Sequence, residues 1–344
     1  MLKICLLGLI AAVLTVIGVG SWVSMPMFDE VRPRFEPEIA NPAQALTFAR
    51  TATSLIRVTS HLGDRVTGVD LTATLGPAQT EDLITLVNRL DFDALLSIEE
   101  PTVTEPLDQL IAPLAYTPPA LAAGTNFKAH ADEIYSDDPP FVFPKLAASG
   151  TWEDDVPITA RLDYEAELAV FPLADIRSPD VLPRFGLVLA NDFTDRWTLI
   201  RELDLSRPMG ETGFAAAKGC LGCLPTGYLV VIPRSGEFYK TLDVSLYLND
   251  ALRQRFPIDA LIMPIEDIVR TAFDQDVVPY QKGESTVSLL PHGSIPRGTL
   301  ILLGTGAGVL FKPLNLWNAD FYLQPGDVVR TEARYLGHLE NRIR

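Results

Sequence analysis

The chain has 344 residues, of which 47% are hydrophobic, so it is long enough to bury one large or two modest cores. Its 44 acidic and 28 basic residues give a formal charge of -16, and no cluster of lysine and arginine interrupts that balance. Because this charge repels phosphate backbones, we expect no nucleic-acid partner. The 3 cysteines are too few for a disulfide framework.

The N-terminal residues 4–23 form an apolar run without a charge. About twenty such residues match the length of a membrane-spanning helix and exceed the core of a signal peptide. We therefore expect residues 1–28 to be an uncleaved membrane anchor, with a cleaved signal or a buried helix as alternatives. A short tip carrying Lys3 favours an N-terminus in the cytoplasm, which would place the body of the protein outside it.

The next segment, residues 29–120, reads as a polar tether followed by a small mixed module. Residues 57–60 and 66–75 have the composition of strands. Leucines at helical spacing predict a helix over residues 80–90, with Thr80 as its N-cap. These elements together predict an α/β module that packs against the rest of the chain.

A proline-rich stretch at residues 112–124 predicts a stiff connector and a domain boundary near residue 120. Residues 121–344 then consist mainly of short β-branched and apolar runs separated by glycine, proline and aspartate. One helical pattern, residues 264–273, interrupts them. The fold class predicted is mainly β with some α (α+β), as a largely antiparallel, folded-over sheet rather than alternating β and α units.

Two carboxylates lie close together in the strand-like run RLDYEAELAVFPL, residues 161–173. Because side chains alternate along a strand, Glu165 and Glu167 share one face. Asp192 follows another apolar strand, where a loop begins. Three such carboxylates suit a hard divalent cation, Mg²⁺ or Mn²⁺, that leaves positions for water or substrate. The alternative is a solvated strand face and an unrelated aspartate turn.

The pair Cys220 and Cys223 forms a C-x-x-C motif. Its surroundings lack a helix start and a second cysteine pair for zinc, so structural or incidental thiols are expected, with a redox pair as the alternative. The glycines of residues 304–308 follow a strand, but their spacing is not that of a dinucleotide loop and no helix follows.

Several motifs occur in an order that resembles the fumarylacetoacetate hydrolase family. DYEAELAVF, LANDFTDR, the AKG around Lys218, LLGTGAGV and LQPGDVV correspond to DYEVELA, ANDxSAR, GKxxD, TGTPAG and PGDVV of that family. The resemblance covers residues 121–344 and implies the family's mixed β-sandwich roll. Relatives are commonly dimers, so it also implies a homodimer.

The resemblance implies roles for individual residues. Glu165, Glu167 and Asp192 would be metal ligands, and His130, Glu133 and Lys218 would be catalytic. Arg196, Lys145 and Thr305 would bind substrate. Without the family resemblance, the spacing of His130 and Glu133 is typical of two residues on the surface of a helix. Lys145 would then be an ordinary charged residue on the surface.

The implied activity is that of a metal-dependent hydrolase, which cleaves a carbon–carbon bond in a β-dicarbonyl or acylpyruvate-like 2-oxo acid. The alternatives are an isomerase, hydratase or decarboxylase of a 2-oxo acid, or a non-catalytic metal-binding module displayed on a membrane. The sequence departs from the family pattern at three places, which leaves the identity of the substrate open. KGCLGC stands where relatives commonly have KSFDTF, and Leu199 stands where they often have a glutamine. Asp195 and Trp197 flank Arg196 in place of the usual residues.

Overall fold

The computed structural model describes residues 2–23, 36–113, 115–313 and 315–344, and it describes their side chains except at residues 2–6, 17, 19–23 and 118. The helices are α1 (Leu2–Val23), α2 (Leu71–Leu75), α3 (Pro77–Thr80), α4 (Leu83–Arg89), α5 (Phe92–Ser97), α6 (Lys128–Glu133), α7 (Arg196–Glu202), α8 (Phe214–Ala217) and α9 (Ile265–Asp274). Short 3₁₀ turns are η1 (Leu107–Gln109), η2 (Phe238–Thr241), η3 (Ile258–Ala260) and η4 (Ala319–Phe321). Part of the predicted tether, residues 24–35, lies outside the described residues.

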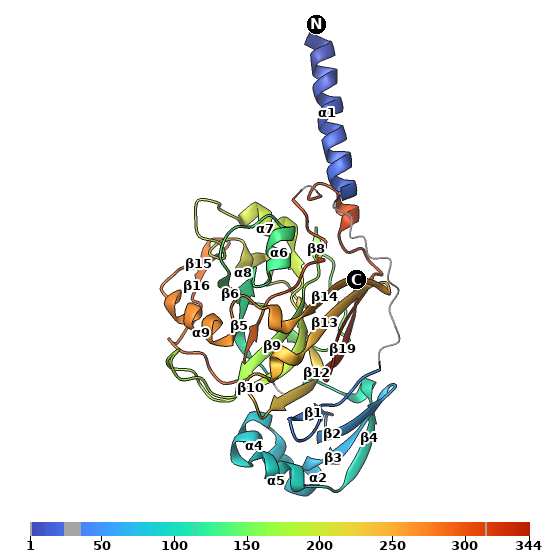
Figure 1. Ribbon diagram of the computed structural model, residues 1–344, viewed down its shortest axis with the longest axis vertical. Helices are drawn as coiled ribbons and strands as arrows, with labels where there is room; N and C mark the ends of the chain where they lie inside the picture. Colours follow the sequence, from blue (N-terminus) through green and yellow to red (C-terminus); the bar gives the residue numbers. More distant parts are fainter. Residues whose placement is uncertain (1, 24–35, 114, 314) are drawn as a thin grey trace.

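The strands form two principal sheets (Figure 1). The larger, 11-stranded sheet has the order β4-β3-β2-β1-β12-β10-β9-β17-β5-β6, with β7 beside β12. The smaller, 4-stranded sheet has the order β14-β13-β18-β19. Two short pairs, β8 with β11 and β15 with β16, complete the pattern. The strand bounds are β1 (Ala45–Arg50), β2 (Leu55–Leu62), β3 (Arg65–Asp70), β4 (Thr102–Pro106), β5 (Thr117–Gly124), β6 (Phe141–Lys145), β7 (Ser149–Gly150), β8 (Leu162–Asp163), β9 (Ala166–Pro172), β10 (Phe185–Asn191), β11 (Thr194–Asp195), β12 (Leu224–Pro233), β13 (Asp243–Leu248), β14 (Ala251–Pro257), β15 (Tyr280–Lys282), β16 (Ser285–Val287), β17 (Thr299–Leu302), β18 (Val328–Ala333) and β19 (Gly337–Arg342).

The core lies between the two sheets. Strand β19 contacts β12, and β13 contacts β9, so the smaller sheet covers the middle of the larger one. All residues of β9 and of β12 are buried. A strand that is covered on both faces needs apolar residues at successive positions, which explains the continuous run LVVIP at the end of β12. The mainly β character predicted from sequence is confirmed. The fold is built on a large mixed sheet, and helices accompany the strands.

The N-terminal module is joined to the rest of the chain through the large sheet. Strand β1 pairs antiparallel with β12, from Ala45 opposite Pro233 to Phe48 opposite Val230. The predicted connector is itself partly a strand, because β5 pairs with β6 and, in parallel, with β17. A register shift between Thr299 and Ile301 falls opposite its prolines, which have no N–H to donate to a neighbouring strand. The boundary predicted at residue 120 therefore lies inside β5.

Two local predictions in this module were wrong. The strand-like run 66–75 ends at Asp70, whose side chain accepts a hydrogen bond from Ala73 N at 3.0 Å and so caps helix α2. Helix α4 is capped by Asp82 rather than by Thr80, since Asp82 Oδ1 accepts from Ile84 N at 2.9 Å. The Thr80 hydroxyl instead pairs with that of Thr72.

The N-terminal helix α1 lies apart from the body of the protein (Figure 1). Its side chains are described at residues 7–16 and at residue 18, and the large apolar ones among them are exposed. Within the described part of the chain, no helix has the length and hydrophobicity needed to cross a membrane. The membrane anchor predicted for residues 1–28 is therefore not supported.

Candidate active site

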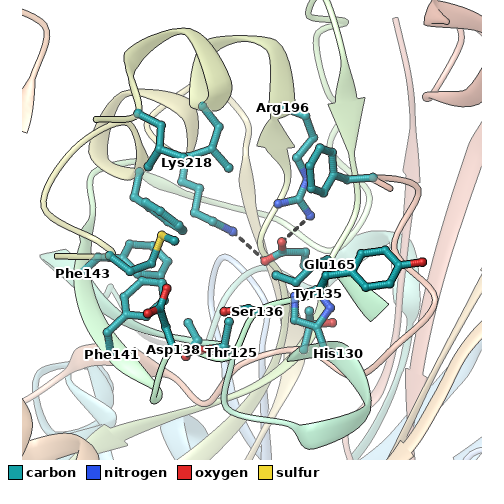
Figure 2. A pocket seen from close by; sticks show the side chains of 18 of the residues that line it. Thr125, His130, Tyr135, Ser136, Asp138, Phe141, Phe143, Glu165, Arg196 and Lys218 are labelled. Carbon is teal, nitrogen blue, oxygen red and sulfur yellow. Dashed lines mark hydrogen bonds and ion pairs between the residues drawn. The ribbon is translucent and has the colours of Figure 1, made fainter. Parts of the chain in front are cut away.

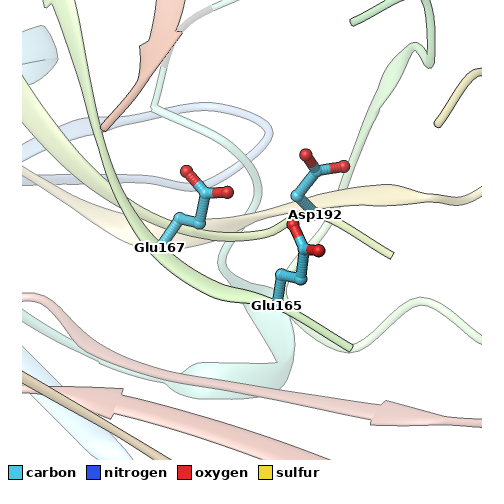
Figure 3. Close-up of side chains that lie close together, drawn as sticks. All are labelled: Glu165, Glu167 and Asp192. Carbon is cyan, nitrogen blue, oxygen red and sulfur yellow. The ribbon is translucent and has the colours of Figure 1, made fainter. Parts of the chain in front are cut away.

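Three carboxylates converge where strands β9 and β10 meet (Figure 3). Glu165 immediately precedes β9, Glu167 is its second residue, and Asp192 follows the last residue of β10. The antiparallel ladder continues past both strands, because Asp192 N donates to Glu165 O at 2.8 Å. One oxygen from each carboxylate lies within 4.8 Å of those of the other two, and all three residues are buried. The predicted convergence of the three carboxylates is confirmed.

Lys218, which follows helix α8, binds two of these carboxylates. Its Nζ lies 2.6 Å from Glu165 Oε2, 2.9 Å from Asp192 Oδ2 and 2.8 Å from Thr194 Oγ1. Burial alone would lower the pKa of Lys218, but the charges of Asp192 and Glu165 raise it above its usual value. The ammonium group is therefore charged at neutral pH.

Lys145 approaches the site from the other side of Asp192. Its Nζ lies 2.5 Å from Asp192 Oδ1 and donates to the carbonyl oxygen of Cys223 at 2.7 Å. The side chain is fully buried and does not line the cavity described below. Lys145 is not the surface charge that it resembles in sequence. It is placed to hold Asp192, and its predicted contact with substrate gains no support from this position.

Arg196, the first residue of α7, holds the remaining oxygen of Glu165. It donates from Nε to Asp163 Oδ2 at 2.8 Å and from a terminal nitrogen to Glu165 Oε1 at 2.5 Å. Asp163 also accepts from the backbone N–H groups of Leu310 at 2.9 Å and Phe311 at 3.1 Å. Both oxygens of Glu165 are thus bound by cations. Through Asp163, the backbone of Leu310 and Phe311, which follow β17, is hydrogen-bonded to the same cluster.

The pKa values of the two glutamates shift in opposite directions. Burial alone would raise the pKa of Glu165, but Lys218 and Arg196 lower it to about 2. Burial raises the pKa of Glu167 well above its usual value, and the charges of Asp192 and Glu165 add to this. Glu167 Oε2 accepts from Gly304 N at 2.7 Å. Three buried carboxylates, one of which is costly to ionise without a further cation, are donors that fit a hard metal ion, so the group could hold one.

His130 and Glu133 lie together on helix α6. His130 Nδ1 is 3.3 Å from Glu133 Oε2, and the two side chains are only 8% and 12% exposed. They are therefore not the surface helical pair that the spacing alone suggests. Glu133 Oε1 accepts from Gly308 N at 2.9 Å and forms an ion pair with Lys312. Burial lowers the pKa of His130 to about 4, so its ring is neutral at pH 7 and can accept a proton.

A cavity of about 310 Å³ opens beside these groups (Figure 2). His130, Glu165, Arg196 and Lys218 line one part of it, together with Thr305. The Thr305 hydroxyl accepts a hydrogen bond from Gln254 Nε2 at 2.8 Å. The residues that line the rest are mainly apolar and include Phe141, Phe143, Leu199, Leu203, Met209 and Phe214. The structure therefore brings the predicted site residues to one place, with Lys145, Glu133, Glu167 and Asp192 behind the lining.

A disulfide joins Cys220 to Cys223, whose Cα atoms are 5.3 Å apart. The expectation of structural or incidental thiols was therefore wrong, because the two sulfur atoms are bonded to each other. The bridge closes a tight turn just after Lys218 and just before β12. Because the carbonyl of Cys223 accepts from Lys145, the turn also supports the lysine behind Asp192.

Sequence reasoning missed Asp163, Lys312 and Gln254. Asp163 could have been found, because it begins the same DYEAE run that carries the two glutamates. Lys312 is 179 residues from Glu133, and Gln254 bridges Thr305 and the backbone of Ala166 from strand β14. Neither contact has a local signal in the sequence, since each depends on how distant segments pack.

A family model described as fumarylacetoacetate (FAA) hydrolase C-terminal matches residues 120–344. The match spans well over half of the chain, and the chain belongs to the fumarylacetoacetate hydrolase family. Its class is therefore that of an enzyme in a family of hydrolases and isomerases. No curated protein matched the chain by sequence.

Solved structures share the fold. A probable 2-hydroxyhepta-2,4-diene-1,7-dioate isomerase from Mycobacterium abscessus is 23% identical, with a TM-score of 0.58, over 87% of this chain and 97% of its own. Fumarylacetoacetate hydrolase from Exiguobacterium antarcticum is 20% identical, with a TM-score of 0.58, over 88% and 99%. Maleylpyruvate hydrolase from Sphingobium sp. SYK-6, in complex with manganese(II) and pyruvate, is 22% identical, with a TM-score of 0.54, over 86% and 98%. At these identities the likeness establishes the fold alone.

Proposed function

We propose that this protein is a hydrolase that cleaves a carbon–carbon bond in an acylpyruvate-like 2-oxo acid, with Mg²⁺ or Mn²⁺ held by Glu165, Glu167 and Asp192. The observation that carries the proposal is the neutral His130, paired with Glu133, which lines the same cavity as Glu165 and Lys218. A structural relative of the same fold is a hydrolase in complex with manganese(II) and pyruvate.

When bound, the ion supplies a Lewis acid for the oxygens of a 2-oxo acid. The chain fixes its ligands before any substrate arrives. Lys218 and Arg196 hold the two oxygens of Glu165, and Lys145 and Lys218 hold those of Asp192. The carboxylates therefore need little reorganisation, which is the condition for strong electrostatic catalysis.

His130 is the proposed general base. Since its Nδ1–H faces the Glu133 carboxylate, Nε2 is the nitrogen that can take a proton from water. The water oxygen forms a bond to the acyl carbonyl carbon, and the bond from that carbon to the adjacent methylene breaks. The departing pyruvate enolate receives the proton back from His130. Lys218, whose ammonium lies at the edge of the cavity, stabilises the negative oxygen that forms.

A substrate panel with Mg²⁺ or Mn²⁺ tests this proposal. Acylpyruvates, oxaloacetate and 2-oxo-dienoates should separate hydrolysis from decarboxylation and isomerisation. We expect pyruvate and a carboxylic acid from acylpyruvates, and a loss of at least about 100-fold in kcat in His130→Ala. Tautomerisation without cleavage would favour the isomerase alternative, which the isomerase of the same fold supports. Turnover that is unchanged in His130→Ala would favour a non-catalytic binding module.

We further propose that the protein lies outside the cytoplasm and forms a homodimer. The Cys220–Cys223 disulfide supports the first part, since disulfides persist in oxidising compartments. Family resemblance alone supports the second. Cell fractionation with trapping of free thiols and light scattering of the purified protein test these two statements. Labelling of both cysteines in freshly lysed cells would contradict the proposed compartment.

A further inference from the structure

The cavity has two chemically different ends. The ionic end carries His130, Glu165, Arg196 and Lys218, and the apolar end carries Phe141 and Phe143, which lie on the side away from His130 and Arg196 (Figure 2). Phe214 packs against both of these rings, and Met209 precedes Gly210, which lies against the ring of Phe141. Leu199 and Leu203 are further apolar lining residues. We propose that the substrate carries a single carboxylate and an uncharged, apolar acyl group that fills the apolar end. This inference rests on the proposed function, because it takes the ionic end as the place of the 2-oxo acid.

The two ends are in direct contact. Lys218 Nζ lies 5.5 Å from the centre of the Phe143 ring. Phe143 and Phe141 pack against Phe214, with ring centres 4.9 and 5.2 Å apart respectively. If the reacting carbonyl of the substrate lies beside Lys218, the acyl group that extends from it therefore contacts aromatic side chains directly. Burial of each added methylene there should raise affinity about threefold to fourfold.

The apolar end offers no cation to a second carboxylate, although the hydroxyl groups of Thr125 and Ser136 also line the cavity. Among the described residues that line the cavity, the basic side chains are His130, Arg196 and Lys218, all at the ionic end. Besides Glu165 at the ionic end, the acidic lining residues are Asp137 and Asp138, and Figure 2 shows Asp138 on the same side as Phe141 and Phe143. A dicarboxylate would place its second charge against apolar rings and these two acids.

The rim of the apolar end gives a means of changing this preference. Met209 is only half-buried, so a longer polar side chain can be placed there without opening the core. Met209→Lys would bring an ammonium group to the apolar end. Met209→Leu keeps its apolar character and is the matched control. Val277→Lys adds the same charge at a position that is 88% exposed and outside the cavity.

Calorimetric binding of unreactive 2-oxo acids to the full chain with Mn²⁺ tests the inference without requiring turnover. The probes are pyruvate, 2-oxohexanoate, 2-oxooctanoate and the dicarboxylate 2-oxooctanedioate. We expect 2-oxooctanoate to bind more tightly than pyruvate by at least about 30-fold and more tightly than the dicarboxylate by at least about tenfold. Met209→Lys should reduce or reverse the preference for 2-oxooctanoate over the dicarboxylate, whereas Met209→Leu and Val277→Lys should preserve this preference.

Equal or tighter binding of the dicarboxylate by the unmodified protein would overturn the inference, and so would affinity that does not rise with chain length. This comparison stands even if Met209→Lys fails to fold. Hydrolysis of acylpyruvates with alkyl chains of increasing length, assayed in parallel, separates the two proposals. A binding preference without cleavage would leave the inference intact and reject the proposed reaction; cleavage with a preference for dicarboxylates would do the reverse.

Discussion

Lys312 forms an ion pair with Glu133, the carboxylate that faces His130. The lysine comes from the segment after β17, and its contact with Glu133 fixes the carboxylate from the side opposite the imidazole. Since Gly308 N binds the same oxygen, the His130–Glu133 pair on α6 is held by a segment far away in sequence.

Lys312→Met should lower kcat about tenfold, and it should also lower the melting temperature because it leaves the largely buried Glu133 without this cation. The charge of Lys312 also contributes to lowering the pKa of His130, below the larger effect of burial. Its loss should therefore raise the pKa of His130 and move the acid limb of the kcat/KM profile to higher pH. Lys282→Met, at an exposed position, is the control. An unshifted acid limb in Lys312→Met would show that Lys312 does not act on His130.

Glu167→Gln should remove metal binding without destabilising the metal-free protein. Because burial and the charges of Asp192 and Glu165 raise the pKa of Glu167 well above its usual value, ionised Glu167 contributes little stability to the metal-free protein, and a neutral glutamine should cost little there. Thermal unfolding with and without Mn²⁺ measures the effect. At about 100 times Kd, the ion should stabilise the unmodified protein by about 2.7 kcal/mol. Glu284→Gln, on the surface, should keep this gain. A full Mn²⁺ response in Glu167→Gln would contradict the ligand assignment.

Asp163→Ala should be among the most destabilising single changes at the site. It leaves the buried Arg196 with one carboxylate instead of two, and it removes the acceptor for Leu310 N and Phe311 N. Loss of one partner of a buried ion pair costs about 3 to 5 kcal/mol. Asp195→Ala nearby removes only the N-cap of α7, at about 1 kcal/mol. Urea unfolding compares the two variants, and equal losses would show that Asp163 has no special structural role.

His61 should make the protein less stable in mild acid. The residue is buried on β2, and neither ring nitrogen has a hydrogen-bond partner among the described residues. Burial lowers the pKa of His61 from 6.5 to about 4. Between these values the unfolded chain binds a proton that the folded protein does not, so stability falls as the pH decreases from about 6.5 to about 4.

The loss from this residue should amount to about 1 to 3 kcal/mol. His61→Phe, which can preserve the edge contact with Tyr228, should remove that part of the pH dependence. His292→Gln, on the surface, should retain it. Urea unfolding at pH 7 and at pH 4.5 gives the comparison, and parallel losses in His61→Phe and the unmodified protein would refute the assignment.

The sequence predicted those parts of the fold and site that have local signals. Alternation around Glu165 and Glu167 placed both on one face, and the helix at α9 and the strands at β10, β12 and β18 followed from periodicity and turn residues. Asp192 followed from its place after an apolar run where a loop begins, and the family motifs supplied Lys218.

The remaining features depend on tertiary packing. The proline-rich connector became strand β5 because two neighbouring strands bind it, which its composition does not reveal. The sequence around Lys145 does not show whether this lysine is buried or exposed. Only its burial against Asp192 in the structure distinguishes it from a surface lysine. The bond between Cys220 and Cys223 depends on the turn that brings their Cα atoms within reach.

The pairing of β1 with β12 also protects the solubility of the catalytic part. In its absence, the apolar residues 230–233 of β12 would lose their partner strand and leave an open strand border. Unpaired apolar borders of this kind recruit other chains and start aggregation. The small N-terminal module thus covers an edge of the large sheet. Deletion of residues 36–113 should therefore give a protein that aggregates, and not a smaller active enzyme.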